Sequence, residues 1–183
     1  MSKKFIILNT ILREGGFSDN PYDTGGKTMY GITKRTARNF GYTGNIKDLS
    51  LEKAIDIYDK GFWQPIRLDS INDSRIQELL FDARVNHSPG VSVKTAQRAF
   101  NMLHKEDKEL AEDGLIGSQT IGALNNYSHG VYGKEPLIDA MLMIRGQYFR
   151  DIVENREDQT VFIVGWLRRL RKLRNSVGFR WKR

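Results

Sequence analysis

The chain has 183 residues, of which 39% are hydrophobic and 28% are charged, the proportions of a globular protein that can bury a core. It contains no cysteine, which excludes disulfide bonds, thiolate metal sites and a cysteine nucleophile. The formal net charge of +7 is unevenly placed, since eight of the 29 lysines and arginines follow Gln159 and no acidic residue does.

The first helix is predicted between Phe5 and Glu14, because Phe5, Leu8, Ile11 and Leu12 recur at the spacing of one helix face. Gly15 suits the position after the helix, where a positive φ is favoured. The apolar opening ends too early for a secretory signal peptide, and no stretch is long enough to cross a membrane. We therefore expect synthesis in the cytoplasm without a signal peptide.

Two carboxylates and a hydroxyl lie close together in the sequence, on Glu14 at the end of this helix and on Asp23 and Thr28 in the glycine-rich segment after it. Glu14 ends the predicted helix, beside the negative end of the helix dipole, which disfavours ionisation of its carboxyl. Asp23 lies in a turn rich in backbone donors, which favours its ionised form. A protonated and an ionised carboxyl are the pair that glycosidases use. Alone, each residue would be an ordinary surface residue; together with Thr28 they indicate a catalytic site.

The same segment resembles glycoside hydrolase family 108, the cell-wall muramidases. The family motif is Glu-Gly-Gly followed by Asp-x-Gly-Gly-x-Thr-x-x-Gly-Ile-Thr/Ser, and every fixed position is filled here, from Glu14 to Thr33. The resemblance implies an N-acetylmuramidase in which Glu14 is the general acid. Asp23 would stabilise the oxocarbenium-like state or activate water, Thr28 would position that water, and Tyr30 would contact the substrate.

The spacing is also similar to the E-x8-D-x5-T pattern of phage-type lysozymes. The gap between Glu14 and Asp23 agrees with that pattern, but four residues instead of five precede Thr28. This similarity favours an inverting mechanism and leaves a retaining one open.

Two further helices are predicted in the N-terminal half, with Thr33 and Ser50 as their N-caps. The second should end in the segment 61–65, which contains a proline. Trp63 in this segment is expected to bind the substrate by stacking on a sugar, or else to pack in the core.

The next helix is predicted to start at Asp73 or Ser74. Its segment from Phe81 to Asn86 resembles the Phe-Asp-x-x-Val-Asn motif of the family. Asn86 is therefore expected to face the substrate, with a helix C-cap as the alternative.

The C-terminal half is predicted to be helical from about Ser92. Gln97 matches a recurrent Leu-Gln of the family, with Ala96 in place of the leucine, and is expected to bind the substrate. Residues 113–124 resemble the Asp-Gly-x-x-Gly-x-x-Thr-x-x-Ala-Leu signature of small peptidoglycan-binding modules, with Ser118 as the predicted N-cap. A long helix should begin near Pro136. In the final basic helix, residues 165–169 resemble the Gly-Trp-x-x-Arg motif of the family.

We therefore expect a mostly α, lysozyme-like, two-lobed fold with a small irregular or β-hairpin element over residues 17–32. Residues 1–90 would form the catalytic lobe, and residues 91–183 a helical peptidoglycan-binding lobe with a basic tail. The three histidines lack metal-ligand spacing and no phosphate-binding glycine loop is present, so we expect neither a metal nor a cofactor.

The expected function is that of a monomeric peptidoglycan hydrolase, an endolysin that acts on the glycan strands of the bacterial wall after release or export. The segment from Arg168 to Arg183 interleaves cations with apolar residues. It is expected to bind anionic envelope polymers or outer-membrane lipids, or to be the solvated face of the last helix. No nucleic-acid partner is expected. The alternative is a non-enzymatic cell-wall-binding or nucleic-acid-binding protein that acts through this tail.

Overall fold

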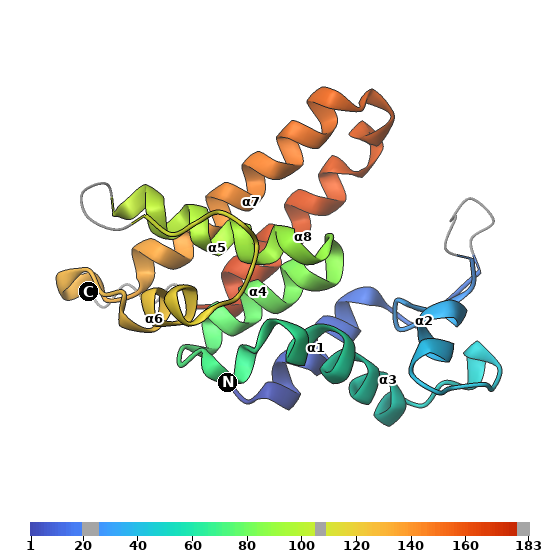
Figure 1. The fold of residues 1–183 in the computed structure, drawn as a ribbon. Helices are drawn as coiled ribbons and strands as arrows, with labels where there is room; N and C mark the ends of the chain where they lie inside the picture. Colours follow the sequence, from blue (N-terminus) through green and yellow to red (C-terminus); the bar gives the residue numbers. More distant parts are fainter. Residues whose placement is uncertain (20–25, 105–108, 179–183) are drawn as a thin grey trace. The chain divides into compact units, whose positions relative to one another are not determined.

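The computed structural model of the chain describes residues 1–19, 26–104 and 109–178 (Figure 1). Eight α-helices and one three-stranded antiparallel sheet occur within these residues. The chain divides into two compact units, residues 1–67 and residues 68–183. The mostly α architecture and the small β-element are thus confirmed, while a domain boundary near residue 90 stays a prediction.

The N-terminal unit contains the sheet and three of the described α-helices. Two predicted caps are confirmed here, since the side chains of Thr33 and Ser50 each accept a hydrogen bond from the backbone N–H three residues further on. The elements are α1 (Lys3–Glu14), β1 (Phe17–Ser18), β2 (Thr28–Met29), β3 (Ile32–Thr33), α2 (Lys34–Asn39) and α3 (Leu51–Tyr58), with the short turns η1 (Ile46–Asp48), η2 (Asp59–Trp63) and η3 (Gln64–Ile66).

Helix α1 ends as predicted but buries a different face. Gly15 has a φ of 87° and donates its N–H to the carbonyl of Ile11. Of the residues on the predicted apolar face, Phe5 and Leu12 are 50% and 77% exposed, whereas Ile11 is buried. Apolar residues occur on both faces of this helix, so their spacing predicts a helix without deciding which face packs against α3. The buried side chains are Ile6, Ile7, Thr10 and Ile11.

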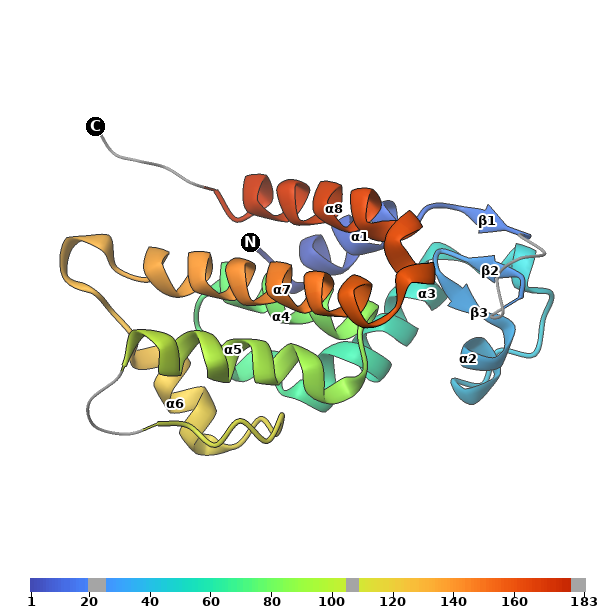
Figure 2. The same cartoon turned by 90° about the horizontal axis from the view of Figure 1, so that it is seen from above.

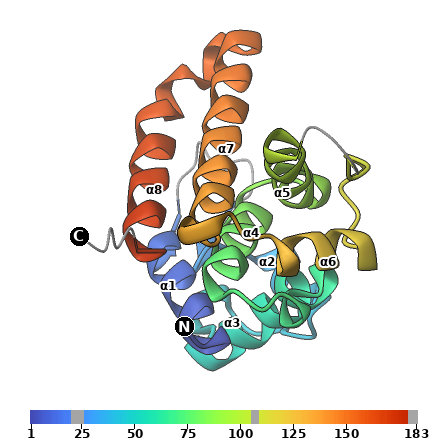
Figure 3. The ribbon, with the colours of Figure 1, turned by 90° about the vertical axis from the view of Figure 1, so that its left-hand side faces the viewer.

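The C-terminal unit is built around α7, which contacts α4, α5 and α8 (Figures 2 and 3). Two helix starts differ from the prediction. Helix α5 begins at Pro89 instead of about Ser92, because proline fits the first turn of a helix, and Gly117 instead of Ser118 is the N-cap of α6. The elements are η4 (Leu68–Ser70), α4 (Ser74–Asn86), α5 (Pro89–Leu103), α6 (Ser118–Asn126), η5 (Gly130–Tyr132), α7 (Glu135–Asn155), η6 (Glu157–Phe162) and α8 (Ile163–Ser176).

A buried ion cluster joins α4, α7 and α8. Asp82 of α4 is fully buried, and Nη2 of Arg145 lies 2.7 Å from its Oδ2. Arg169 of α8 donates to Oδ1 of the same carboxylate from Nε at 3.0 Å and from Nη2 at 2.8 Å. Burial alone would raise the pKa of Asp82, but the two arginines lower it overall.

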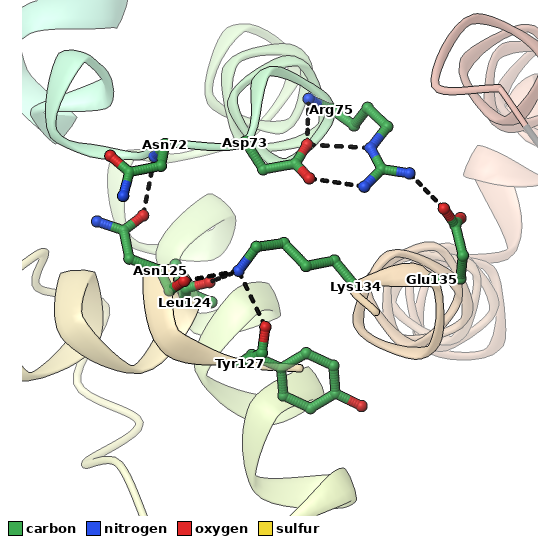
Figure 4. Close-up of polar contacts among 8 residues, drawn as sticks. All are labelled: Asn72, Asp73, Arg75, Leu124, Asn125, Tyr127, Lys134 and Glu135. Atoms are coloured by element: carbon green, nitrogen blue, oxygen red, sulfur yellow. Dashed lines mark hydrogen bonds and ion pairs between the residues drawn. The ribbon is translucent and has the colours of Figure 1, made fainter. Parts of the chain in front are cut away.

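A second polar network lies where α4 and α7 begin and α6 ends (Figure 4). Lys134 donates from Nζ to the carbonyl oxygens of Leu124, Asn125 and Tyr127, at 2.8, 2.8 and 3.0 Å. One ammonium group therefore satisfies three carbonyls at the C-terminus of α6. Burial lowers the pKa of Lys134.

Replacing Lys134 should destabilise the C-terminal unit. The substitution Lys134→Met keeps the length of the side chain but removes the charged donor from the three carbonyls, which should reduce the free energy of unfolding by about 2–3 kcal/mol. Urea unfolding measures the effect. Lys172→Met, at an exposed position of α8, is the control and should change stability by less than about 0.5 kcal/mol. Equal losses in the two variants would contradict this role of Lys134.

His87, the residue after α4, should make stability depend on pH. Its ring packs edge-on against Tyr148, with centroids 4.9 Å apart. Burial, and then the charge of Arg145, lowers the pKa of His87 from 6.5 to about 4. The unfolded chain therefore takes up this proton at a higher pH than the folded chain does. The free energy of unfolding should fall between about pH 6.5 and pH 4, by about 2 kcal/mol after allowance for solvent screening.

Urea unfolding at pH 7, 5.5 and 4.5 tests this pH dependence. His87→Gln should flatten the decline, because the variant has no imidazole to protonate at this position. His129→Gln, at an exposed histidine, should leave the decline unchanged. An unchanged slope in His87→Gln would contradict the prediction.

Candidate active site

Strands β2 and β3 form a hairpin whose two-residue turn is Tyr30-Gly31. Both turn residues have a positive φ, 55° for Tyr30 and 73° for Gly31, as in a type I′ turn. A tyrosine is unusual in this conformation. Its carbonyl oxygen accepts a 2.8 Å hydrogen bond from the hydroxyl of Tyr58, a buried residue of α3, which holds the turn in place. The paired residues are Thr28 with Thr33 and Met29 with Ile32.

Glu14, the last residue of α1, lies directly against Gly31. A β-carbon placed at Gly31 would be 3.0 Å from Cβ and Cγ of Glu14 and 3.1 Å from its Oε2. The Glu14 side chain is half-buried, and its Oε1 atom is shielded from solvent. Glycine is therefore required here both for the positive φ and for the space that the glutamate occupies. This contact brings Glu14 to the turn that contains Tyr30.

Of the other two predicted catalytic residues, the structure describes Thr28. Thr28 is a half-buried residue of the middle strand β2, opposite Ser18 of β1 and Thr33 of β3. Asp23 lies outside the described residues. The pairing of Glu14 with Asp23, and the role of Thr28, therefore stay predictions.

A cavity of about 670 Å³ lies in the N-terminal unit, where the chain enters β2. Neither Glu14 nor Thr28 is among its lining residues. Its cationic lining would favour an anionic group of a ligand. The cavity is lined by Lys27, Lys34 and Arg38, with Gly26, Thr43, Gly44, Asn45 and Ile46.

Trp63 is fully buried at the end of η2. The Nζ atom of Lys3 lies 5.4 Å from the centre of its ring. A ring without accessible surface offers no face to a sugar, so the structure favours the packing role for this residue.

Gln97 of α5 is 1% exposed and uses both ends of its amide group within the C-terminal unit. Its Nε2 donates to Oδ1 of Asp113 at 2.8 Å and to Oγ1 of Thr120 at 3.2 Å. Its Oε1 accepts a 3.0 Å hydrogen bond from the N–H of Gly114. Gln97 thus holds the glycine-rich turn before α6, and the structure favours this structural role for it.

Asn86 lies at the C-terminal end of α4, where its Nδ2 donates to the carbonyl oxygen of Asp82 at 2.7 Å. The C-cap of α4 is His87, so Asn86 is not the cap expected as its alternative role, although its side chain does bond within the last turn. Asn86 also lines a cavity of about 380 Å³ within the C-terminal unit. A contact with substrate therefore stays a prediction for this residue.

The cluster of Asp82, Arg145 and Arg169 is the main feature that the sequence analysis missed. Asp82 and Arg169 each lie in a motif that resembles the family, but their sequence separation hides the pairing. The sequence signal that could have revealed the cluster is a charged residue within the apolar face of a helix, because a buried charge requires a partner. Arg145, between Met141 and Phe149 of α7, shows the same signal.

Comparison with known proteins agrees with the motif and the fold. Residues 7–88 match the family Glycosyl hydrolase 108, and residues 91–171 match the family Predicted Peptidoglycan domain. No curated protein matches the chain significantly. Among solved structures, the fold is similar to that of SagA from Brucella abortus, with a TM-score of 0.74 and 23% identity over 96% of this chain and 95% of the SagA chain.

The lysozyme-like fold class is thereby confirmed. Within the described ranges, no helix is both long and apolar enough to span a membrane. The same ranges hold no cluster of three or more histidine or acidic side chains suited to a metal ion. The chain joins a glycosyl hydrolase 108 domain at residues 7–88 to a predicted peptidoglycan domain at residues 91–171, and it is a glycosidase that acts on peptidoglycan.

Proposed function

We propose that the protein is an N-acetylmuramidase, which hydrolyses the β-1,4 bond between N-acetylmuramic acid and N-acetylglucosamine. The observation that supports this most is the contact of Glu14 with Gly31, because it joins the first residue of the motif to the turn near its end. A half-buried carboxyl held against a rigid turn is suited to deliver a proton to a fixed position.

In the proposed mechanism, Glu14 protonates the glycosidic oxygen while the bond from that oxygen to the anomeric carbon breaks. Asp23 stabilises the positive charge that develops at the anomeric carbon, or takes the proton of the attacking water. Thr28 positions the water and Tyr30 contacts the sugar. The glycine end of α1 holds the backbone of Glu14, and the Tyr58 hydroxyl holds the turn.

We further propose that the enzyme acts as a monomeric endolysin, which degrades the wall during lysis of a bacterial host after its release or export. Helix α8 supports a role at the cell envelope, because Arg168, Arg171 and Lys172 are exposed beside the exposed Leu167. Such a surface is attracted to anionic polymers and lipid headgroups.

The substitution Glu14→Gln should lower the rate of peptidoglycan cleavage by about 10²–10⁴-fold, because the amide cannot donate the required proton. The assay measures reducing ends released from purified sacculi, followed by borohydride reduction and identification of the reduced sugar. Reduced muramic acid identifies a muramidase. Glu52→Gln, at an exposed glutamate of the same unit, should retain full activity.

Three outcomes of this assay would count against the proposal. Wild-type rates in Glu14→Gln would exclude the role of Glu14. Reduced glucosamine would show that the other glycosidic bond is cleaved. Release of amines without reducing ends would identify an amidase or a peptidase.

The substitution Gly31→Ala should reduce activity far more than a matched glycine substitution does. The new methyl group would displace the Glu14 side chain, and a misplaced catalytic group costs about 10²-fold in rate. Gly41→Ala is the matched control, because Gly41 has a φ of 79° and its β-carbon position has no neighbour within 4 Å. Both variants should lose about 1–2 kcal/mol of stability through backbone strain. Equal activities of the two variants would show that the contact with Glu14 is unimportant.

A further inference from the structure

The cavity of about 380 Å³ in the C-terminal unit takes no part in the proposed mechanism. Its lining comes from the end of α4, from α7 and the turn after it, and from α8, helices that lie side by side in Figures 2 and 3. It combines aromatic rings with nitrogen-containing polar groups. The lining residues are Asn86, His87, Ser88, Tyr148, Phe149, Ile152, Arg156, Gln159, Trp166 and Arg169.

The aromatic wall is held in place by its own contacts. Trp166 stacks on Phe149, with ring centroids 5.0 Å apart and an interplanar angle of 21°. Phe162 stacks on Trp166 at 6.1 Å. Rings fixed by neighbouring rings give a rigid apolar surface, against which alkyl groups of a ligand can pack at little entropic cost.

The charged side chains that line the cavity are all positive. Its described lining includes Arg156 and Arg169 and no acidic residue. Arg169 shares the carboxylate of Asp82 with Arg145, so two guanidinium groups face one carboxylate. Arg156 is 65% exposed and pairs with Asp158 at 3.2 Å, a surface pair that contributes little and can exchange its partner. The cavity therefore favours a ligand with a negative charge.

His87 adds a polar group to the cavity. Its Nε2 atom is buried and has no hydrogen-bond partner in the part of the chain that the structure describes. The ring is neutral at pH 7, because burial and Arg145 lower its pKa to about 4. A neutral imidazole can form a hydrogen bond with a ligand amide without adding charge. The cavity thus offers an apolar wall, cations and a neutral polar group together.

We propose that this cavity binds the peptide stem of peptidoglycan, with Arg156 and Arg169 holding a stem carboxylate and the aromatic wall contacting the alkyl side chains. The inference rests on peptidoglycan as the substrate and specifies which part of it this unit recognises. A peptide stem has carboxylates, amides and methyl groups, which match the lining. A glycan without stems offers lactyl carboxylates, hydroxyls and N-acetyl groups, but it has no alkyl side chains to contact the aromatic wall.

The test is calorimetric titration of the full-length protein with the disaccharide tetrapeptide N-acetylglucosaminyl-N-acetylmuramyl-tetrapeptide. This ligand is a product of muramidase cleavage, so it stays intact during the measurement. Arg156→Gln should weaken its binding by about tenfold or more, because it removes a charged contact to the carboxylate. Arg150→Gln is the matched control, since Arg150 lies on α7 and is also 65% exposed. It should bind as tightly as the wild type.

Two further ligands locate the recognised group. The same disaccharide with a free lactyl carboxylate, and a neutral chitin tetrasaccharide, should both bind more weakly than the tetrapeptide form. Equal binding of the free-lactyl disaccharide would assign the carboxylate to the sugar and overturn the stem proposal. Unchanged affinity in Arg156→Gln, or no binding at millimolar tetrapeptide, would also overturn it. The titration measures binding and compares Arg156→Gln with Arg150→Gln, and neither residue belongs to the proposed catalytic mechanism, so its outcome can be told apart from that of the muramidase assay.

Discussion

The close approach of Glu14 to Gly31 is the contact on which the catalytic proposal depends. It requires that α1 end at Glu14 and that Tyr30 and Gly31 both have a positive φ. It also requires that residue 31 have no β-carbon. A proton donor is effective only when it is held at a fixed distance from the atom that it protonates. The surrounding unit supplies this rigidity through buried groups such as Tyr58, which lie outside the motif.

The C-terminal unit depends on a different interaction, the sharing of one buried carboxylate by two arginines. Taking three charges out of water is costly, and such a cluster persists where its geometry satisfies each group. Here it ties α4 to α7 and α8 at the positions where these helices line the cavity. The same cluster therefore supports the packing of the unit and sets the charge of its cavity.

Local chemistry explains what could be predicted from the sequence. The caps at Thr33, Ser50 and Asp73, the glycine end of α1 and the hairpin all depend on residues within a few positions of one another. Long-range contacts explain what could not. The buried face of α1, the burial of Trp63 and the partners of Gln97 depend on elements that meet only in the folded chain.

The candidate site shows the same division. Its motif names Glu14 and Gly31 but gives no sign that their atoms touch. Asp82 and Arg169 each stand in a recognisable motif, yet periodicity cannot pair residues on helices so far apart in the chain. Arg145 lies among apolar residues and indicates only that some buried partner exists.

The close packing of Glu14 against Gly31 restricts the residues that these two positions can hold together. A β-carbon at Gly31 would lie 3.0 Å from Cβ and Cγ of Glu14, so a larger residue at this position would have to shift the acidic side chain. A protein with a larger residue at this position is expected to hold a long acidic side chain in a different place. The room left at this one turn position therefore limits where the carboxyl of Glu14 can lie.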